Sequence, residues 1–334
     1  MTQPERRWTR PLQIALGLAI SAGLIYWSFH SYSFADIWAD IQVVQPLPML
    51  LAVVLATLPF ALRVPRWKLL LRHEDGVSIP TSPMWNAIAI GFAANNTLPL
   101  RAGEFLRVAA INRLARVSFA SALASIAVER VIDGLVVVTL LGVGLVGGDL
   151  PAGDAMAAKA KVIGLTCLAA MAMAIVAAWQ RQTTLRLLDR ILPNGTFATK
   201  FVAFVDRVLQ GLGAMRDPRR AIPVVLWSLI IWTVNALGFF VAFKAFGLDV
   251  PFAGALVLQG ALVIGIAIPS SPGYFGVMET AISATLVLYG VDREHGLAYA
   301  LVYHIATFIP ITVMGAFAAI RAGMLVGRGP IPHE

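Results

Sequence analysis

Long runs of apolar residues separated by short polar stretches occupy most of this chain. A helix needs about 20 mostly apolar residues to cross the hydrocarbon core of a bilayer. Membrane-spanning barrels show only short segments of alternating polarity, so runs of this length predict an all-α, polytopic transmembrane bundle that forms a single membrane domain over 1–334. About six spans are expected, at 11–29, 47–71, 119–148, 159–179, 221–246 and 297–321.

Two further apolar regions, 81–118 and 252–290, are interrupted by residues that disfavour a continuous helix. They contain the stretches NNTLPLRAGEFLRV and IPSSPGYFGVMET. Proline removes a helical hydrogen bond, and glycine tolerates turns that other residues resist. The charge in the second arm of the first region favours a re-entrant hairpin there, whereas the second region is either such a hairpin or a pair of spans. The predicted hinge residues are Pro99, Gly103, Pro269, Pro272 and Gly276.

The composition supports a membrane protein. Hydrophobic residues make up 58% of the 334 and charged residues only 13%, and the mean hydropathy is +0.78. Soluble domains have about 25% charged residues. The formal net charge of +8 is therefore attributed to loops that orient the chain in the membrane, and no nucleic-acid partner is expected.

The basic residues are unevenly distributed. Most of the 26 Lys and Arg residues lie at the two termini and in 63–75, 101–116 and 181–220, whereas the predicted loop after the first span carries Asp36 and Asp40 and no cation. Because Lys and Arg accumulate in cytoplasmic loops, both termini are expected in the cytoplasm, with the chain in a bacterial plasma (inner) membrane. In 181–220, apolar residues recur at helical spacing among the charges, which predicts a cytoplasmic amphipathic connector.

This orientation gives the chain an internal symmetry. The first unit, about 47–148, and the second, about 221–321, each place two spans around one broken region, and they cross the membrane in opposite directions. Interrupted helices in inverted-topology repeats are typical of transporters, whose substrate site lies near the bilayer midplane where the breaks meet. We therefore predict an inverted repeat with a polar site at its centre.

The first broken region carries residues suited to an anion. Backbone amides freed at a helix break and the forked donors of arginine both bind phosphate. Glu104 would then balance the positive charge or carry a proton. The alternative interpretation is an ordinary cytoplasmic loop whose arginines fix the orientation. The candidate substrate-binding residues here are Asn96, Arg101, Glu104 and Arg107.

In the second broken region, Glu279 lies in apolar sequence without a neighbouring cation. A charged side chain at the bilayer centre costs about 2.5–3.5 kcal/mol on insertion scales. This carboxylate is therefore expected to be protonated, to face water, or to meet a partner from elsewhere in the chain. Glu279 and Gly273 are candidate substrate-binding residues. His304 is isolated among apolar residues and is either a satisfied buried histidine or a proton relay.

A charged cluster lies inside the apolar run 119–148. Glu129 and Asp133 are four residues apart and share a helix face, and Arg130 can pair with Asp133. The cluster is expected to face the bundle interior, either as a salt-bridge network that locks helices together or as the lining of a polar path, with Arg130 a candidate substrate-binding residue. Three residues that close the preceding span are expected at the membrane interface, with their cations reaching water: Arg63, Arg66 and Trp67.

Several chemistries lack their motifs in this sequence. It has no GxxxxGK[ST] phosphate loop and no HExxH zinc site, and Cys167 is the only cysteine. No cofactor, catalytic residue or metal site is therefore predicted.

Four ordered motifs, RVPRWKLLL, NNTLPLRAGEFLRV, ASIAVERVIDGL and IPSSPGYFGVMET, together resemble the lysylphosphatidylglycerol synthase transmembrane-region family, also called flippase-like or uncharacterised protein family 0104. The resemblance covers about 10–325. Members include the membrane half of the multiple peptide resistance factors, which resembles a lipid flippase and has an aminoacyl-transferase domain fused behind it. Because this chain stops at Glu334, the resemblance implies the flippase-like half alone. Many relatives have a glycine where this chain has Tyr274.

The hypothesis that follows is a lipid flippase or transporter, not an enzyme. It would move an anionic lipid of the phospholipid or polyprenyl-phosphate type between leaflets, with the phosphate held by arginines of the broken-helix motifs. Two alternatives stay open: a membrane-embedded transferase acting on a lipid-linked substrate, and a partner subunit of a lipid-modifying enzyme. Assembly as a homo-oligomer is compatible with each of them.

Overall fold

The computed structural model describes residues 34–73, 76–98, 102–148, 153–191, 218–267 and 270–324, with isolated positions at 19, 22–23, 26, 151, 195, 202 and 206. Every regular element within these residues is a helix, as the apolar pattern predicts. The predicted span at 11–29 lies almost wholly outside the described residues, and so do Pro99, Arg101 and Pro269.

Among the described residues, five helices are long and apolar enough to cross a membrane, and they match five of the predicted spans. Their starts follow local rules: α3 begins with a proline, and the Ser118 hydroxyl before α6 accepts the Ser121 N–H at 3.2 Å. The five helices are α3 (Pro46–Leu70), α6 (Phe119–Gly147), α7 (Asp154–Trp179), α10 (Pro218–Ala245) and α13 (Arg293–Arg321).

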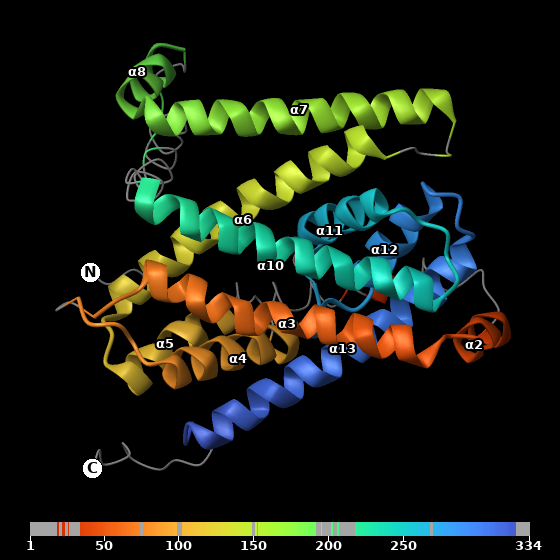
Figure 1. Cartoon of the computed structure of the whole chain (residues 1–334), viewed down its shortest axis with the longest axis horizontal. Coiled ribbons are helices and arrows are strands. Elements are labelled where there is room, and N and C mark those ends of the chain that lie inside the picture. Colours follow the sequence, from red (N-terminus) through yellow and green to blue (C-terminus); the bar gives the residue numbers. More distant parts are fainter. Residues whose placement is uncertain are drawn as a thin grey trace, which may run out of the picture.

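The helices α3 and α10 run antiparallel along the bundle (Figure 1). The Gln45 N–H, just before α3, donates to the Ala245 carbonyl at 2.9 Å. We call this end of the bundle the Ala245 end, and the opposite end, where α3 finishes and α6 begins, the Leu70 end. α13 runs from the Ala245 end, where His295 lies 3.2 Å from Asp40, to the Leu70 end.

The first broken region forms two short helices, α4 (Thr81–Thr97) and α5 (Gly103–Ala115), which pack against each other. α4 starts at the Leu70 end, where Lys68 Nζ donates to Thr81 Oγ1 at 2.7 Å. α5 finishes at the same end, where Arg113 donates to the Gly323 carbonyl at 3.4 Å. The facing ends of the two helices, Thr97 and Gly103, therefore lie away from the Leu70 end.

The second broken region enters from the other end. It consists of α11 (Phe252–Ile266), the short 3-10 helix η2 (Pro272–Tyr274) and α12 (Val277–Val287). The start of α11 packs closely on α6 at the Ala245 end, where a Cβ on Gly144 would lie 2.8 Å from the Ala253 carbonyl oxygen. Because α4 contacts η2, the two broken regions approach each other from opposite ends (Figure 1).

A close backbone approach explains Gly103, one of the predicted hinges. The Gly103 N–H donates to Asn95 Oδ1 at 2.9 Å, and a Cβ on Gly103 would lie 1.9 Å from the Gly91 carbonyl oxygen. Gly103 thus lets α5 start directly against α4.

Two further helices are amphipathic. The prediction of a loop after the first span is wrong, because this segment contains the helix α2 (Phe34–Gln42). Ile37 on α2 is buried, and α2 packs against α13. α8 (Arg181–Ile191) has no buried residue, as expected for the first part of the amphipathic connector. The remainder of the predicted connector lies mostly outside the described residues.

The buried apolar residues form two large clusters, one toward each end of the bundle. One includes Phe243, Leu258 and Tyr299 toward the Ala245 end, and the other includes Trp67 and Ile111 toward the Leu70 end. The polar groups described next are packed among and between these clusters.

Candidate functional site

A network of charged side chains is buried between α3, α5 and α6. Glu129 at its centre has no exposed surface. Arg107 donates to both Glu129 oxygens, at 2.9 and 3.0 Å, and Arg66 lies 3.1 Å from one of them. Arg63 Nη1 lies 3.5 Å from the same oxygen, and Arg130 donates to it as well. This single carboxylate therefore balances charge from three helices.

Asp133, one turn further along α6, is the second acceptor of the network. Arg66 donates to it, and Arg63 and Arg130 lie 3.4 and 3.5 Å away. The indole N–H of Trp232 on α10 donates to the same carboxylate at 2.9 Å. The predicted grouping of Glu129, Arg130 and Asp133 thus exists, and it joins four helices.

The prediction that Arg63, Arg66 and Trp67 lie at the membrane interface is wrong. They are 6%, 0% and 0% exposed. Trp67 donates its indole N–H to the Ser125 hydroxyl at 2.9 Å, and the Arg107 guanidinium lies 3.9 Å from its ring centre. The physical reason is that both arginines face the carboxylates of α6, which compensate the charges that burial would otherwise disfavour.

Arg130 is the accessible member of the network. Its side chain is 41% exposed, and its guanidinium lies 3.7 Å from Glu104 on α5. Among the residues that the structure describes, the network contains four arginines and three carboxylates, so their formal balance is one positive charge. That surplus is open to an anion at Arg130.

A cavity of about 230 Å³ lies where the two broken regions approach each other. Its lining combines aromatic rings, among them Phe60, Trp232, Phe239 and Phe308, with aliphatic side chains. Its polar lining residues come from α4, α10, α11, η2 and α13, and they are Asn96, Asn235, Gln259, Tyr274, Tyr303, His304 and Thr307. Trp232 lines the cavity and also bonds Asp133, so the cavity and the charge network share a wall.

Glu279 meets a partner from another helix, one of the three alternatives predicted for it. Its Oε1 lies 2.7 Å from His304 Nδ1, and its Oε2 accepts the Gly276 N–H at 2.6 Å. Both side chains are buried, and His304 lines the cavity. The carboxylate thereby caps the N-terminus of α12 and holds the imidazole at the cavity wall.

The family model described as the lysylphosphatidylglycerol synthase TM region matches residues 14–315. The chain belongs to this family. The match includes the charge network, both broken regions and the residues that line the cavity.

Three relatives extend this comparison. Glycosyltransferase AglD of Haloferax volcanii is 25% identical over 94% of this chain, and this chain spans only 55% of that relative. A UPF0104 membrane protein of Methanothermobacter thermautotrophicus is 27% identical over 70% of this chain and 72% of its own length. A UPF0104 membrane protein of Pyrococcus horikoshii is 20% identical over 93% and 96%.

In this family member, the described candidate residues other than Glu279 fall into two groups. Asn96 and Gly273 line the cavity, and Asn96 donates to the Thr312 hydroxyl at 3.0 Å. Arg107 and Arg130, by contrast, belong to the charge network, where Arg107 is 2% exposed. Of the hinges that the structure describes, Pro272 opens η2 and Gly276 precedes α12 with a φ of 85°.

Sequence reasoning missed Gln259, Asn235 and Trp232. Gln259 lies in the apolar stretch VLQGALVIGI, and Asn235 and Trp232 lie inside a predicted span. An isolated amide in such a run is a weak signal for a site, because it is costly to bury without a partner. Only the fold shows that these side chains share one cavity.

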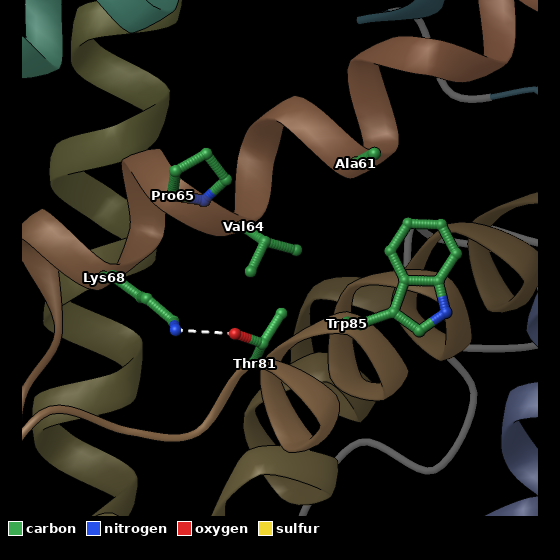
Figure 2. Close-up of a pocket in the computed structure, with 6 residues that line it drawn as sticks. All are labelled: Ala61, Val64, Pro65, Lys68, Thr81 and Trp85. Carbon is green, nitrogen blue, oxygen red and sulfur yellow. Dashed lines mark hydrogen bonds between the residues drawn. The ribbon is translucent and has the colours of Figure 1, made fainter.

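A second concave feature is a groove of about 260 Å³ between α3 and α4 (Figure 2). Ala61, Pro65, Lys68 and Trp85 are among its lining residues, and Figure 2 shows Lys68 pointing to Thr81. On α3, helical spacing puts these positions opposite the face that carries the network. The groove is therefore separate from the network, and no described residue lines both the groove and the cavity.

No group of three or more His, Cys, Asp or Glu side chains placed to hold a metal ion occurs in the part of the chain that the structure describes.

Proposed function

We propose that this protein moves a lipid with an anionic headgroup between the two leaflets of a membrane. The observation that carries the proposal is the shared wall at Trp232, which joins a cavity with amide, hydroxyl and imidazole groups in its lining to a buried charge network with one surplus positive charge among the described residues. A headgroup needs such a polar route because it is costly to move through hydrocarbon.

The arrangement of the broken regions supports transport. α4 and α5 enter from the Leu70 end, and α11 and α12 enter from the Ala245 end, with the cavity where they approach each other. We take each region as a re-entrant hairpin and the two as the centres of an inverted repeat, 47–148 and 221–321. In transporters built this way, rocking of one unit against the other exposes a central site alternately to each side.

The charged residues suggest how an anion would be held. We assign the phosphate to Arg130, because its guanidinium is both accessible and adjacent to the network. Arg107 would remain paired with Glu129, as it is here, and support Arg130 through that carboxylate. Arg101 stays a candidate ligand from the first break.

The energy for movement would come from the lipid gradient or from a coupled ion, since the sequence has no nucleotide-binding motif. The buried Glu279–His304 pair at the cavity wall is our candidate for a proton carrier. We place the protein in a bacterial plasma membrane with both termini in the cytoplasm, on the strength of the basic residues near the Leu70 end.

Purified protein in liposomes with fluorescent phosphatidylglycerol tests the proposal by the rate at which label in the inner leaflet reaches an external quencher. We expect Arg130→Gln to lower that rate about tenfold or more, because a lost charge-assisted hydrogen bond is worth about 1.5–3 kcal/mol. Arg190→Gln removes the same charge from the exposed helix α8 and should leave the rate unchanged. Equal rates in liposomes with and without protein, or in wild type and Arg130→Gln, would reject the proposal.

One comparison favours a second candidate function. The relative named a glycosyltransferase matches nearly the whole of this chain, which suggests a transferase acting on a lipid-linked substrate. In that case the purified protein would form a new glycolipid from an activated sugar and a polyprenyl phosphate. Mass spectrometry of the extracted lipids distinguishes the two functions, because transport leaves the lipids chemically unchanged.

A further inference from the structure

Gln259 is a buried amide for which the described part of the chain supplies no hydrogen-bond partner. Its side chain is on α11, is 1% exposed, and lines the cavity. Neither its amide nitrogen nor its amide oxygen has a hydrogen-bond partner among the described residues. Leaving such a group unsatisfied costs about 1–3 kcal/mol, so the amide is suited to a bonding partner that enters the cavity.

The chemistry of the cavity lining limits which kinds of ligand group can be that partner. Its described lining contains no Lys, Arg, Asp or Glu. Among the described residues, two carboxylates bond to lining residues: Glu279 commits one oxygen to His304 and the other to the Gly276 N–H, and Asp133 accepts from Trp232 and Arg66. A headgroup with a free ammonium would therefore find no open carboxylate among these residues.

Amide side chains suit hydroxyl groups instead. An amide offers two N–H donors and a carbonyl acceptor, and a hydroxyl both donates and accepts, so the two can form paired hydrogen bonds. Asn96 and Asn235 line the same cavity as Gln259, and the rings of Phe60, Phe239 and Phe308 offer apolar faces for the carbon skeleton of a polyol.

We propose that this cavity is a subsite for the uncharged, hydroxyl-bearing part of a lipid headgroup, with Gln259 as its specificity-determining residue. The inference rests on the proposed lipid transport, since it divides the headgroup between an accessible cation at Arg130 and a neutral pocket beyond Trp232. Glycerol in phosphatidylglycerol and a sugar on a polyprenyl phosphate share this chemistry.

Binding measurements in detergent test the subsite independently of transport. Native mass spectrometry would give the apparent Kd of the purified protein for phosphatidylglycerol and for a glucosyl polyprenyl phosphate. Phosphatidic acid carries phosphate without a hydroxylated headgroup, and phosphatidylethanolamine carries an ammonium. We expect Gln259→Leu to weaken binding of at least one hydroxylated lipid about tenfold, and to change phosphatidic acid binding less than about twofold. Which of the two loses affinity identifies the source of the hydroxyls.

The matched control is Gln182→Leu, the same chemical change on the exposed helix α8, which should leave all four affinities unchanged. If Gln259→Leu binds every lipid as wild type does, the amide has no ligand and the subsite is rejected. An equal loss for phosphatidic acid and the hydroxylated lipids also rejects it. Should Gln259→Leu show the expected selective loss of binding while the wild-type protein moves no lipid in liposomes, the proposed transport would fail and the subsite would remain.

Discussion

At the scale of single residues, Glu129 is the most constrained side chain of the site. It has no exposed surface and lies within 4 Å of the guanidinium groups of Arg63, Arg66, Arg107 and Arg130. A buried charge is tolerated when it is paired, and removal of one partner leaves its counter-charges uncompensated. The carboxylate is thus a structural element of the bundle as well as a member of the candidate site.

The first prediction concerns this residue. Glu129→Gln keeps the shape of the side chain but removes its charge, which leaves the network with four arginines and two carboxylates. We expect the free energy of unfolding to fall by about 3 kcal/mol or more. Thermal unfolding in detergent measures the loss, and Asp189→Asn on the exposed helix α8 is the control. Equal melting temperatures in both variants would mean that the network contributes little to stability.

Part of this network could be read from the sequence and part could not. Glu129, Arg130 and Asp133 share one helix, where spacing alone predicts contact. Arg66 and Trp232 reach the same carboxylates from 67 and 99 residues away, and no local pattern encodes such a meeting. The sequence consequently placed Arg63, Arg66 and Trp67 at the interface, where cations that end a span usually lie.

At the scale of helices, proline and glycine predicted where the chain breaks but not how closely the pieces pack. The helix breakers predict the two broken regions, whereas the sequence pattern does not predict α2, a helix of only nine residues. Gly103 illustrates the difference. Because Gly103 has no side chain, α5 can pack directly against the backbone of α4.

The second prediction follows from that contact. Gly103→Ala would place a Cβ 1.9 Å from the Gly91 carbonyl oxygen, which is backbone and cannot rotate away. Overpacking of this kind costs about 1–3 kcal/mol, and we expect a matching loss in the free energy of unfolding together with slower lipid transport. Gly134→Ala is the control, since nothing lies within 4 Å of a Cβ there, and in mid-helix it should stabilise by up to about 1 kcal/mol. A Gly103→Ala protein as stable as wild type would show that α5 can shift at no cost.

At the scale of the whole molecule, the site depends on two broken regions that approach each other from opposite ends of the bundle. Apolar run lengths and the distribution of basic residues predicted this arrangement in outline. They did not predict that the amides of Asn235 and Gln259 meet, because each is an isolated amide in an apolar stretch and only tertiary packing brings them to one cavity. The chemistry of the cavity is therefore a property of the assembled bundle.

The last prediction tests whether the two ends of the bundle face opposite sides of the membrane. Cysteines would be introduced one at a time into a Cys167→Ala background, at Val77 and Arg116 near the Leu70 end and at Asp249 and Asp292 near the Ala245 end, all of which are exposed. Basic residues accumulate around the first pair, so we expect a membrane-impermeant maleimide to label Val77→Cys and Arg116→Cys only after cells are opened. Asp249→Cys and Asp292→Cys should react in intact cells. Labelling of both pairs from the same side would contradict the inverted repeat. If the two units cross the membrane in opposite directions, the residues that flank the first broken region must face one compartment and those that flank the second must face the other.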